Sequence, residues 1–154
     1  WHGGAMKPRV DLITLGVTDF DATRKFYVEG LGWAPLFEVP GDVVFLQIGH
    51  GLVLGLFGRN NLDADAAEPH RGEHEAGSPP ISLAHIVETE DEVAALLAAA
   101  EAAGARILKA PQRADFGGFH GYFADPSGFR WEVATNPGWH VGADGSVVIG
   151  PVGD

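Results

Sequence analysis

The stretch that decides the fold runs over residues 123–133 and reads FADPSGFRWEV. Its centre, DPSG at 125–128, combines residues that are typical of tight turns. The flanking runs, 119–124 and 129–135, are short and contain aromatic and β-branched residues, which favours β-strands. We therefore predict two consecutive strands joined by a turn, and we compare the rest of the chain with them.

Upstream of this stretch, the chain reads as a strand, a helix and a further strand. Residues 81–87 have the apolar character of a strand. Thr89 and Glu92 have the spacing of a capping box, and Gly104 is placed to end the helix that they begin. A short strand at 105–108 leads to the two strands described above. The second half thus has the order strand, helix, strand, strand, strand.

The first half shows the same order. Residues 10–17 form a strand, Asp19 is a good N-cap for the helix that follows, and three strand-like runs come next, at 33–39, 43–48 and 52–57. Matching positions in the two halves keep a nearly constant separation, so we predict an internal repeat. The separations are 73 residues for Leu12 and His85, 72 for Gly32 and Gly104, 77 for Gly51 and Gly128, and 77 for Gly55 and Glu132.

A polar segment without periodicity, 58–80, separates the two halves. We expect it to be a long, exposed and mobile linker. It contains His70 and His74, but the surrounding charges and prolines favour a solvated loop over a metal site.

The two ends of the chain, 1–5 and 138–154, lie outside the predicted repeat. Residues 1–5 precede Met6, the only methionine, and are interpreted as a remnant of an expression tag. At the other end, Asp144-Gly145 lies between two short apolar runs, which predicts a hairpin within an extension at 138–154.

Composition narrows the function classes. The chain has 154 residues, 45% of them hydrophobic, which suits one globular domain. It has no cysteine and no apolar run long enough for a membrane span, so we expect a cytoplasmic protein. The net charge of −11 argues against nucleic acid and anionic membranes as partners, and it favours a cationic ligand through electrostatic steering.

Short motifs in both halves point to a known family. They are Leu15-Gly16-Val17-Thr18-Asp19, Phe26-Tyr27 and Leu31-Gly32 in the first half, and Ala84-His85-Ile86-Val87, Ala103-Gly104-Ala105 and the stretch 123–133 in the second. With these motifs the chain resembles the vicinal oxygen chelate superfamily, which includes glyoxalase I, bleomycin-resistance proteins and extradiol dioxygenases. The resemblance implies an α+β fold in which two tandem βαβββ modules form a curved, partly closed mixed sheet around a cleft, with the helices outside.

The resemblance also implies domain boundaries. A single domain would cover 6–137, with module 1 at 10–57, the linker at 58–80 and module 2 at 81–137. Members of this superfamily often form dimers, so we expect a homodimer.

Metal-using members of the superfamily take ligands from the first and last strand of each module. Carried over to this chain, the second module supplies His85 and Glu132, whereas the first supplies Leu12 and Gly55, which cannot bind a metal. A catalytic metal generally needs three protein ligands, and His120 is the candidate for the third. We therefore expect an incomplete metal site and no cofactor; the alternative is a divalent Zn, Ni, Fe or Mn ion.

Several roles remain open for the polar residues. His85 and Glu132 could form a hydrogen-bonded pair without a metal, or Glu132 could be a catalytic general base tuned by His85. Arg130 could hold a carboxylate or phosphate, or it could neutralise Glu132. Strand alternation places Phe45, Gln47, His120 and Tyr122 on the cleft face. The predicted cleft residues are Thr14, Trp33, Phe45, Gln47, Phe57, His120, Tyr122 and Arg130.

The favoured function is a small-molecule-binding protein of the glyoxalase/bleomycin-resistance type, without a complete catalytic metal site. The alternative is a metal-dependent lyase, isomerase or dioxygenase that uses His85 and Glu132. In either case we expect the partner to be a small organic molecule bound in the cleft.

Overall fold

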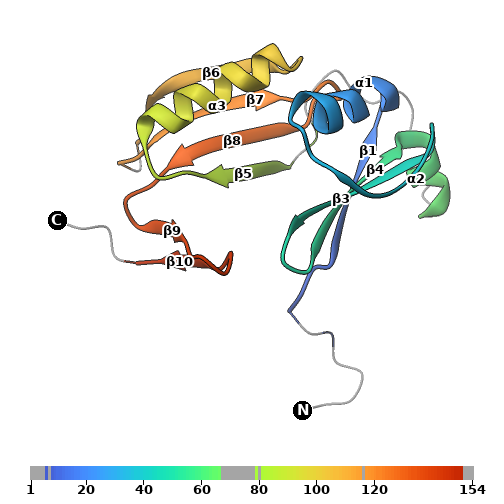
Figure 1. The fold of residues 1–154 in the computed structure, drawn as a ribbon, viewed down its shortest axis with the longest axis horizontal. Helices are drawn as coiled ribbons and strands as arrows, with labels where there is room; N and C mark the ends of the chain where they lie inside the picture. Colours follow the sequence, from blue (N-terminus) through green and yellow to red (C-terminus); the bar gives the residue numbers. More distant parts are fainter. Residues whose placement is uncertain (1–5, 7, 67–78, 80, 116, 151–154) are drawn as a thin grey trace.

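The computed structural model describes residues 6, 8–66, 79, 81–115 and 117–150. It confirms the α+β class and the two βαβββ modules (Figure 1). Module 1 consists of β1 (Leu12–Val17), α1 (Phe20–Lys25), which continues as the π-helical turn η1 (Phe26–Gly30), β2 (Pro35–Val39), β3 (Val43–Gly49) and β4 (Leu52–Gly58). Module 2 consists of β5 (Ser82–Ile86), α3 (Glu90–Ala102), β6 (Arg106–Arg113), β7 (Phe119–Ala124) and β8 (Arg130–Thr135).

Each module forms its own four-stranded sheet. The strand orders are β1-β4-β3-β2 and β5-β8-β7-β6, and the first and last strands of each module pair in parallel. The remaining pairs are antiparallel. The two sheets are separate and not closed into the single curved sheet that the resemblance implied, because β1 and β5 are both sheet edges and are not hydrogen-bonded to each other.

The helices begin and end where the sequence places them. Asp19 caps α1 by accepting a hydrogen bond from the Ala22 N–H at 3.1 Å, and the Thr89 hydroxyl accepts one from the Glu92 N–H at 3.1 Å. Gly104, which follows α3, has a φ of 113°, a left-handed value that a side chain disfavours. Local chemistry therefore sets these helix boundaries.

One face of each sheet packs under the helices and the other does not. In module 1 the packed side chains include Leu15, Leu46 and Leu54, and in module 2 they include Trp131 and Val133. These residues belong to one continuous core that spans both modules. We call the opposite face of each sheet its open face.

A buried chain of hydrogen bonds joins the modules. The Tyr27 hydroxyl, from η1, donates to Asp125 Oδ2 at 2.7 Å and accepts from Trp131 Nε1 at 2.9 Å. Asp125 Oδ1 also accepts from the backbone N–H groups of Ser127 and Phe129, each at 2.9 Å. The turn at 125–128 therefore packs against the helix of the other module, and this contact joins the two modules without a shared sheet.

The linker begins with a helix that the sequence did not predict. Residues Arg59–Asp65 form α2, which packs against β1. A Cβ on Gly16 would lie 2.9 Å from side-chain atoms of Arg59 and Leu62, so the glycine permits this close approach. The absence of a side chain at Gly16 thus lets α2 cover part of the open face of module 1. His70 and His74 lie outside the described residues.

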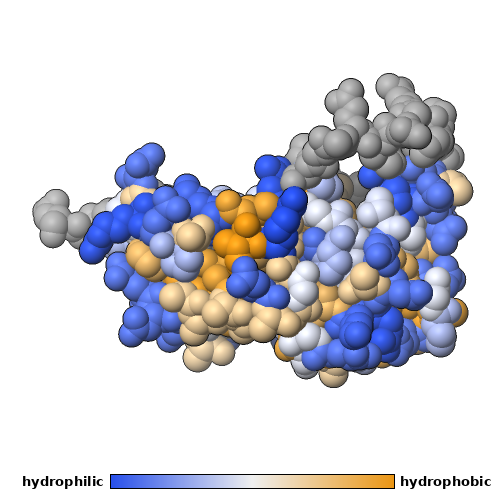
Figure 2. Space-filling view, turned by 90° about the horizontal axis from the view of Figure 1, so that it is seen from above, coloured by the Kyte–Doolittle hydropathy of each residue, from blue (hydrophilic) through white to orange (hydrophobic). Residues whose placement is uncertain are grey.

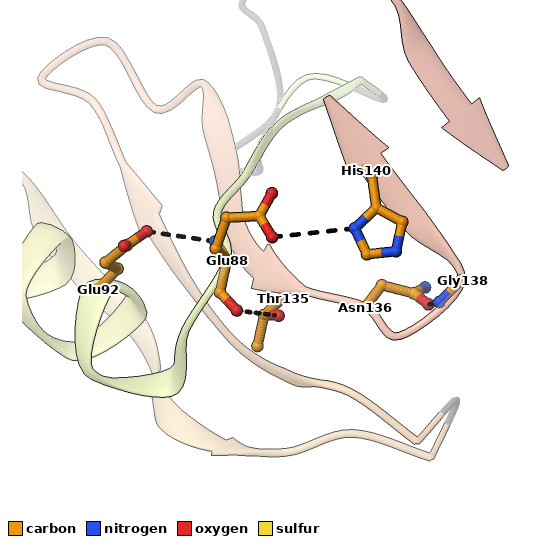
Figure 3. A network of polar contacts seen from close by, with 6 residues as sticks. All are labelled: Glu88, Glu92, Thr135, Asn136, Gly138 and His140. Carbon is orange, nitrogen blue, oxygen red and sulfur yellow. Dashed lines mark hydrogen bonds and ion pairs between the residues drawn. The ribbon is translucent and has the colours of Figure 1, made fainter. Parts of the chain in front are cut away.

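The chain ends in a small hairpin formed by β9 (Trp139–Val141) and β10 (Val147–Ile149). Figure 3 shows Glu88 between this hairpin and β8: its carboxylate lies 3.8 Å from His140 Nδ1, and its carbonyl accepts from the Thr135 hydroxyl at 3.4 Å. The hairpin is thus attached to module 2 through exposed polar contacts.

Most of the surface seen from the β6 side is hydrophilic, with a compact hydrophobic group near its middle (Figure 2). Among the described residues, no helix is long and apolar enough to cross a membrane.

Candidate functional site

The open face of the second sheet carries a cluster of polar side chains. In β7 and β8, Tyr122 is paired in register with Glu132, and laterally paired residues point to the same face. His120 is two residues from Tyr122 and therefore shares this face. Its Nδ1 lies 2.7 Å from Glu132 Oε2, and both side chains are largely buried.

The pairing sets the direction of this hydrogen bond. An ionised carboxylate can only accept, so Nδ1 of His120 is the donor when Glu132 is ionised. A carboxylate oriented in this way can hold a bound group or accept a proton from one that lies within reach. The sequence suggested Glu132 as a general base with His85 as the neighbouring group. In the structure, the imidazole beside Glu132 is that of His120.

Tyr122 lies against the same carboxylate. Partial burial raises the pKa of its phenol above the ordinary value, and the charge and hydrogen bond of Glu132 add to the rise. The hydrogen bond with Ser82 and the charge of Arg130 lower this pKa, but the net shift is still upward. Tyr122 therefore stays protonated at neutral pH and can act as a hydrogen-bond donor on this face.

A cavity of about 380 Å³ opens beside this cluster. Its walls are Ser82, Leu108, Lys109, Tyr122 and Arg130, from four strands of the second sheet. Arg130 Nη2 donates to the carbonyl of Pro79 at 3.0 Å, which directs the guanidinium toward the start of β5 and not into an ion pair with Glu132. Two positive side chains and two hydroxyls therefore border one concave space.

The open face of the first sheet is apolar by contrast. Leu12, Phe45 and Gly55 share it, and a Cβ on Gly55 would lie 3.1 Å from the Phe45 ring and 3.3 Å from Leu12 Cδ1. Thr14 is paired with Gly55 and Gln47 with Val53, so both lie on this face. Phe45 and Leu12 therefore occupy the space that a ligand-bearing side chain at position 55 would need.

Phe57 and Trp33 have different surroundings. Phe57 is paired with Gly16 on the open face of module 1, next to α2. Trp33 does not lie on either open face. Its ring packs 5.4 Å from the Tyr27 ring and 5.9 Å from the Trp131 ring, centroid to centroid, at the edge of the core. The backbone N–H of Trp33 bonds to the Tyr27 carbonyl, which holds the residue beside η1.

His85 and Glu132 lie on opposite faces of the second sheet. In the parallel pair β5–β8, Ala84 is in register with Glu132 and His85 with Val133, whose side chain is in the core. Glu132 instead pairs with His120. The predicted His85–Glu132 pair, as metal ligands or as a hydrogen-bonded couple, is therefore wrong.

The reason is a register shift in the alignment of the two halves. In module 1, Thr14 is in register with Gly55, and in module 2, Ala84 is in register with Glu132. Thr14 therefore corresponds to Ala84, a separation of 70 residues, and two residues earlier Leu12 corresponds to Ser82. The separation of 73 used for His85 is three residues too long, and an odd shift along a strand exchanges its faces.

Ser82 and Lys109 were not identified from the sequence. A constant separation of 70 across the first strands would have indicated Ser82, but no glycine or charged motif marks that register. Lys109 sits where the β6–β7 register shifts, between pairs at Ile107 and Gln112, so alternation along β6 does not predict its direction.

The donor set does not fit a catalytic metal. Within the described part of the chain, no group of three or more His, Asp or Glu side chains is placed to hold an ion. The equivalent positions in the two modules are Leu12 and Gly55 in one and Ser82 and Glu132 in the other, and Glu132 is the only strong metal ligand among them. We therefore derive no step through a metal.

Comparison with known proteins identifies relatives of the same fold. Residues 9–133 match the family described as the Glyoxalase/Bleomycin resistance protein/Dioxygenase superfamily. A glyoxalase-related enzyme from Fulvimarina pelagi is 40% identical, with a TM-score of 0.82 over 94% of this chain and 100% of that one. No functionally curated protein gives a significant match.

Two further solved structures are more distant. Lactoylglutathione lyase from Agrobacterium tumefaciens is 25% identical, with a TM-score of 0.62 over 84% of this chain and 94% of that one. A glyoxalase/bleomycin resistance protein/dioxygenase from Nocardioides is 21% identical, with a TM-score of 0.71 over 86% of each chain, which shows the fold alone. With the match over 9–133, the chain belongs to the glyoxalase/bleomycin resistance protein/dioxygenase superfamily.

Proposed function

We propose that this protein binds a small organic anion, without a metal, on the open face of its second sheet. The observation that carries the proposal is the cavity of about 380 Å³ bordered by Ser82, Lys109, Tyr122 and Arg130. Concave sites with a few convergent polar groups are the usual form of a small-molecule site.

The lining favours an anionic group on the ligand. Lys109 and Arg130 can only donate hydrogen bonds, and both are positively charged. A carboxylate is a suitable partner, since charge-assisted hydrogen bonds are the stronger kind. This local preference opposes the cationic ligand expected from the net charge, and it outweighs that expectation because contacts act at shorter range than the screened field of the whole surface.

Glu132 does not line the cavity but contacts a residue that does. Its carboxylate accepts from His120 and is also hydrogen-bonded to Tyr122. These two contacts stabilise the carboxylate and hold the Tyr122 side chain beside it. The Tyr122 ring in turn forms one wall of the cavity.

The test is calorimetric titration with 2-naphthoate, an aromatic carboxylate, and with 2-naphthol as its uncharged counterpart. Lys109→Gln should weaken naphthoate binding about tenfold, because it removes a charged hydrogen-bond donor. Arg113→Gln is the matched control: Arg113 is in the same strand but does not line the cavity. Equal affinity of Lys109→Gln and Arg113→Gln for naphthoate would contradict the proposed site.

The same titration after dialysis against a chelator tests the absence of a metal requirement. Naphthoate should bind with unchanged affinity. A loss of binding that is restored by a divalent ion would contradict the metal-independent function.

We also propose that the protein forms a homodimer. The edge strand β2 exposes Leu36 at 61%, Phe37 at 56% and Val39 at 41%, and exposed apolar edges tend to be covered. Light scattering should give twice the mass of the chain, and Phe37→Glu should reduce it to the monomer. A monomeric mass for the unaltered protein at micromolar concentration would refute the dimer.

A further inference from the structure

A second cavity, of about 240 Å³, lies on the other side of the second sheet, beneath α3 and at the junction with module 1. We propose that it is a separate binding site for a small uncharged phenol, with His85 as its polar contact. Its walls include Trp33 and Leu31 of module 1 and Leu96, Phe123 and Trp131 of module 2. The sheet separates it from the open face, so this site does not rest on the function proposed above.

The shape and chemistry of the walls suit one aromatic ring. The rings of Phe123 and Trp131 are stacked, with centroids 6.2 Å apart and an interplanar angle of 9°. Trp33 meets Trp131 edge-on at 5.9 Å and 73°. An apolar cavity of about 150 Å³ can hold benzene, so 240 Å³ accommodates a ring with a small substituent. Aromatic rings pack well in such stacked and edge-on surroundings.

The walls are fixed before any ligand binds. Trp131 is held by the hydrogen bond from its Nε1 to Tyr27, and Trp33 by its backbone bond to the Tyr27 carbonyl. At the rim, a Cβ on Gly30 would lie 2.7 Å from Ala103 Cβ, so η1 packs closely against the end of α3. A preorganised site loses little conformational entropy on binding, which favours affinity for a small ligand.

His85 gives the cavity its chemical preference. It is the one ionisable side chain among the described residues that line this space, and it is exposed at the mouth while Trp131 and Val133 form the buried floor. An imidazole can exchange one hydrogen bond with a hydroxyl group whose ring lies in the cavity. The apolar walls and the net charge of −11 disfavour an anion, so the ligand is an uncharged phenol.

The first test compares phenol binding before and after the cavity is filled by a substitution on α3. Phenol is titrated into the protein while backbone amide and indole signals are followed by NMR. The signals of His85, Leu96 and the Trp131 indole should shift together. Ala99→Leu places a larger side chain in the cavity from an exposed position and should weaken phenol binding at least tenfold. Ala98→Leu is the matched control, because Ala98 is exposed on the same helix but does not line the cavity, and it should bind as the unaltered protein does.

The second test isolates the polar contact and does not depend on the cavity-filling variant. His85→Leu should weaken phenol binding about fivefold, the effect of one neutral hydrogen bond, and should leave toluene binding unchanged. Equal phenol affinities of Ala99→Leu and Ala98→Leu would overturn the proposal. Phenol-induced shifts confined to Tyr122 and Glu132 would overturn it as well. Concentration-dependent shifts of the cavity signals without phenol would show instead that another copy of the chain covers this surface.

Discussion

The two modules have the same topology but different open faces. In module 1 this face presents Leu12, Phe45 and Gly55, whereas module 2 presents Ser82, Tyr122 and Glu132 at the equivalent positions. The helix-facing positions are apolar in both modules, with the exception of His85, because each helix must bury one side against its sheet. Packing against the helix therefore constrains the residue types on one face of each sheet, whereas the residue types on the open face can differ between the modules.

The modules also differ in what is attached to them. Module 1 carries α2 on its open face, next to Gly16, and module 2 carries the C-terminal hairpin. The two modules are joined by the chain of hydrogen bonds through Tyr27, not by strand pairing.

The largest effect is expected at the contact between the modules. Tyr27→Phe removes a hydroxyl that is hydrogen-bonded to both Asp125 and Trp131, and it leaves a buried carboxylate and a buried indole N–H without this partner. We expect the free energy of unfolding to fall by about 3 kcal/mol. Tyr122→Phe makes the same chemical change at a half-buried position and should cost less than about 1 kcal/mol. Urea unfolding measures both, and equal losses would show that Tyr27 does not join the modules.

The next largest effect is expected at Gly121, on the packed face of the second sheet, in comparison with Gly55, on the open face of the first. A Cβ on Gly121 would collide with Leu97 Cδ1 and lie 2.7 Å from the Lys109 carbonyl oxygen, so the backbone of β6 would have to move. We expect Gly121→Ala to lower the free energy of unfolding by about 2 kcal/mol. Gly55→Ala meets only the Phe45 ring and Leu12 on the open face, which can shift, and should cost less than about 1 kcal/mol. Thermal unfolding of the pair is the measurement, and a larger loss in Gly55→Ala would reverse the assignment of the packed face.

A smaller effect concerns the pH dependence of stability. Burial raises the pKa of Asp125 above its ordinary value, although hydrogen bonds from Tyr27 and from backbone N–H groups partly offset the rise. The folded state therefore binds this proton more tightly than the unfolded state. The contribution of Asp125 to stability is largest below the unfolded-state pKa, about 4, and is lost as the pH rises through the folded-state value.

We therefore expect the difference in unfolding free energy between the unaltered protein and Asp125→Asn to fall from pH 4 toward neutrality. Asp144→Asn is a control of opposite sign, because hydrogen bonds from Ser146 lower the pKa of Asp144. Urea unfolding at several pH values measures both. If this difference in unfolding free energy rose with pH instead, burial would not be the main influence on the pKa of Asp125.

The smallest effect is expected at the hairpin. Glu88 and His140 form an exposed contact at 3.8 Å, with side-chain exposures of 64% and 59%. Exposed pairs of this kind contribute little, so His140→Ala should leave the free energy of unfolding within about 0.5 kcal/mol of the unaltered value. Calorimetric unfolding checks this, and a large loss would show that the hairpin is an integral part of module 2.

Part of the candidate site follows from strand alternation. Phe45, Gln47, His120 and Tyr122 lie on the open faces, where alternation along β3 and β7 places them. The partner of Glu132 did not follow, because the register of β5 against β8 depends on contacts between strands that are distant in the sequence. The match at Gly32 and Gly104 does not carry over to the strand before the helix, since the segment from the helix N-cap to this glycine is longer in module 2 (89–104) than in module 1 (19–32).

The sequence by itself determined the repeat, the helix caps at Asp19 and Thr89 and the turn at 125–128, because capping, turn chemistry and hydrophobic periodicity are local properties of a few neighbouring residues. Only the tertiary structure decided that His85 faces α3, that Trp33 packs at the edge of the core and that the two sheets remain separate. These outcomes depend on which non-local contacts bury the most apolar surface while keeping Asp125 and Tyr27 hydrogen-bonded, and no single stretch of the chain contains that information.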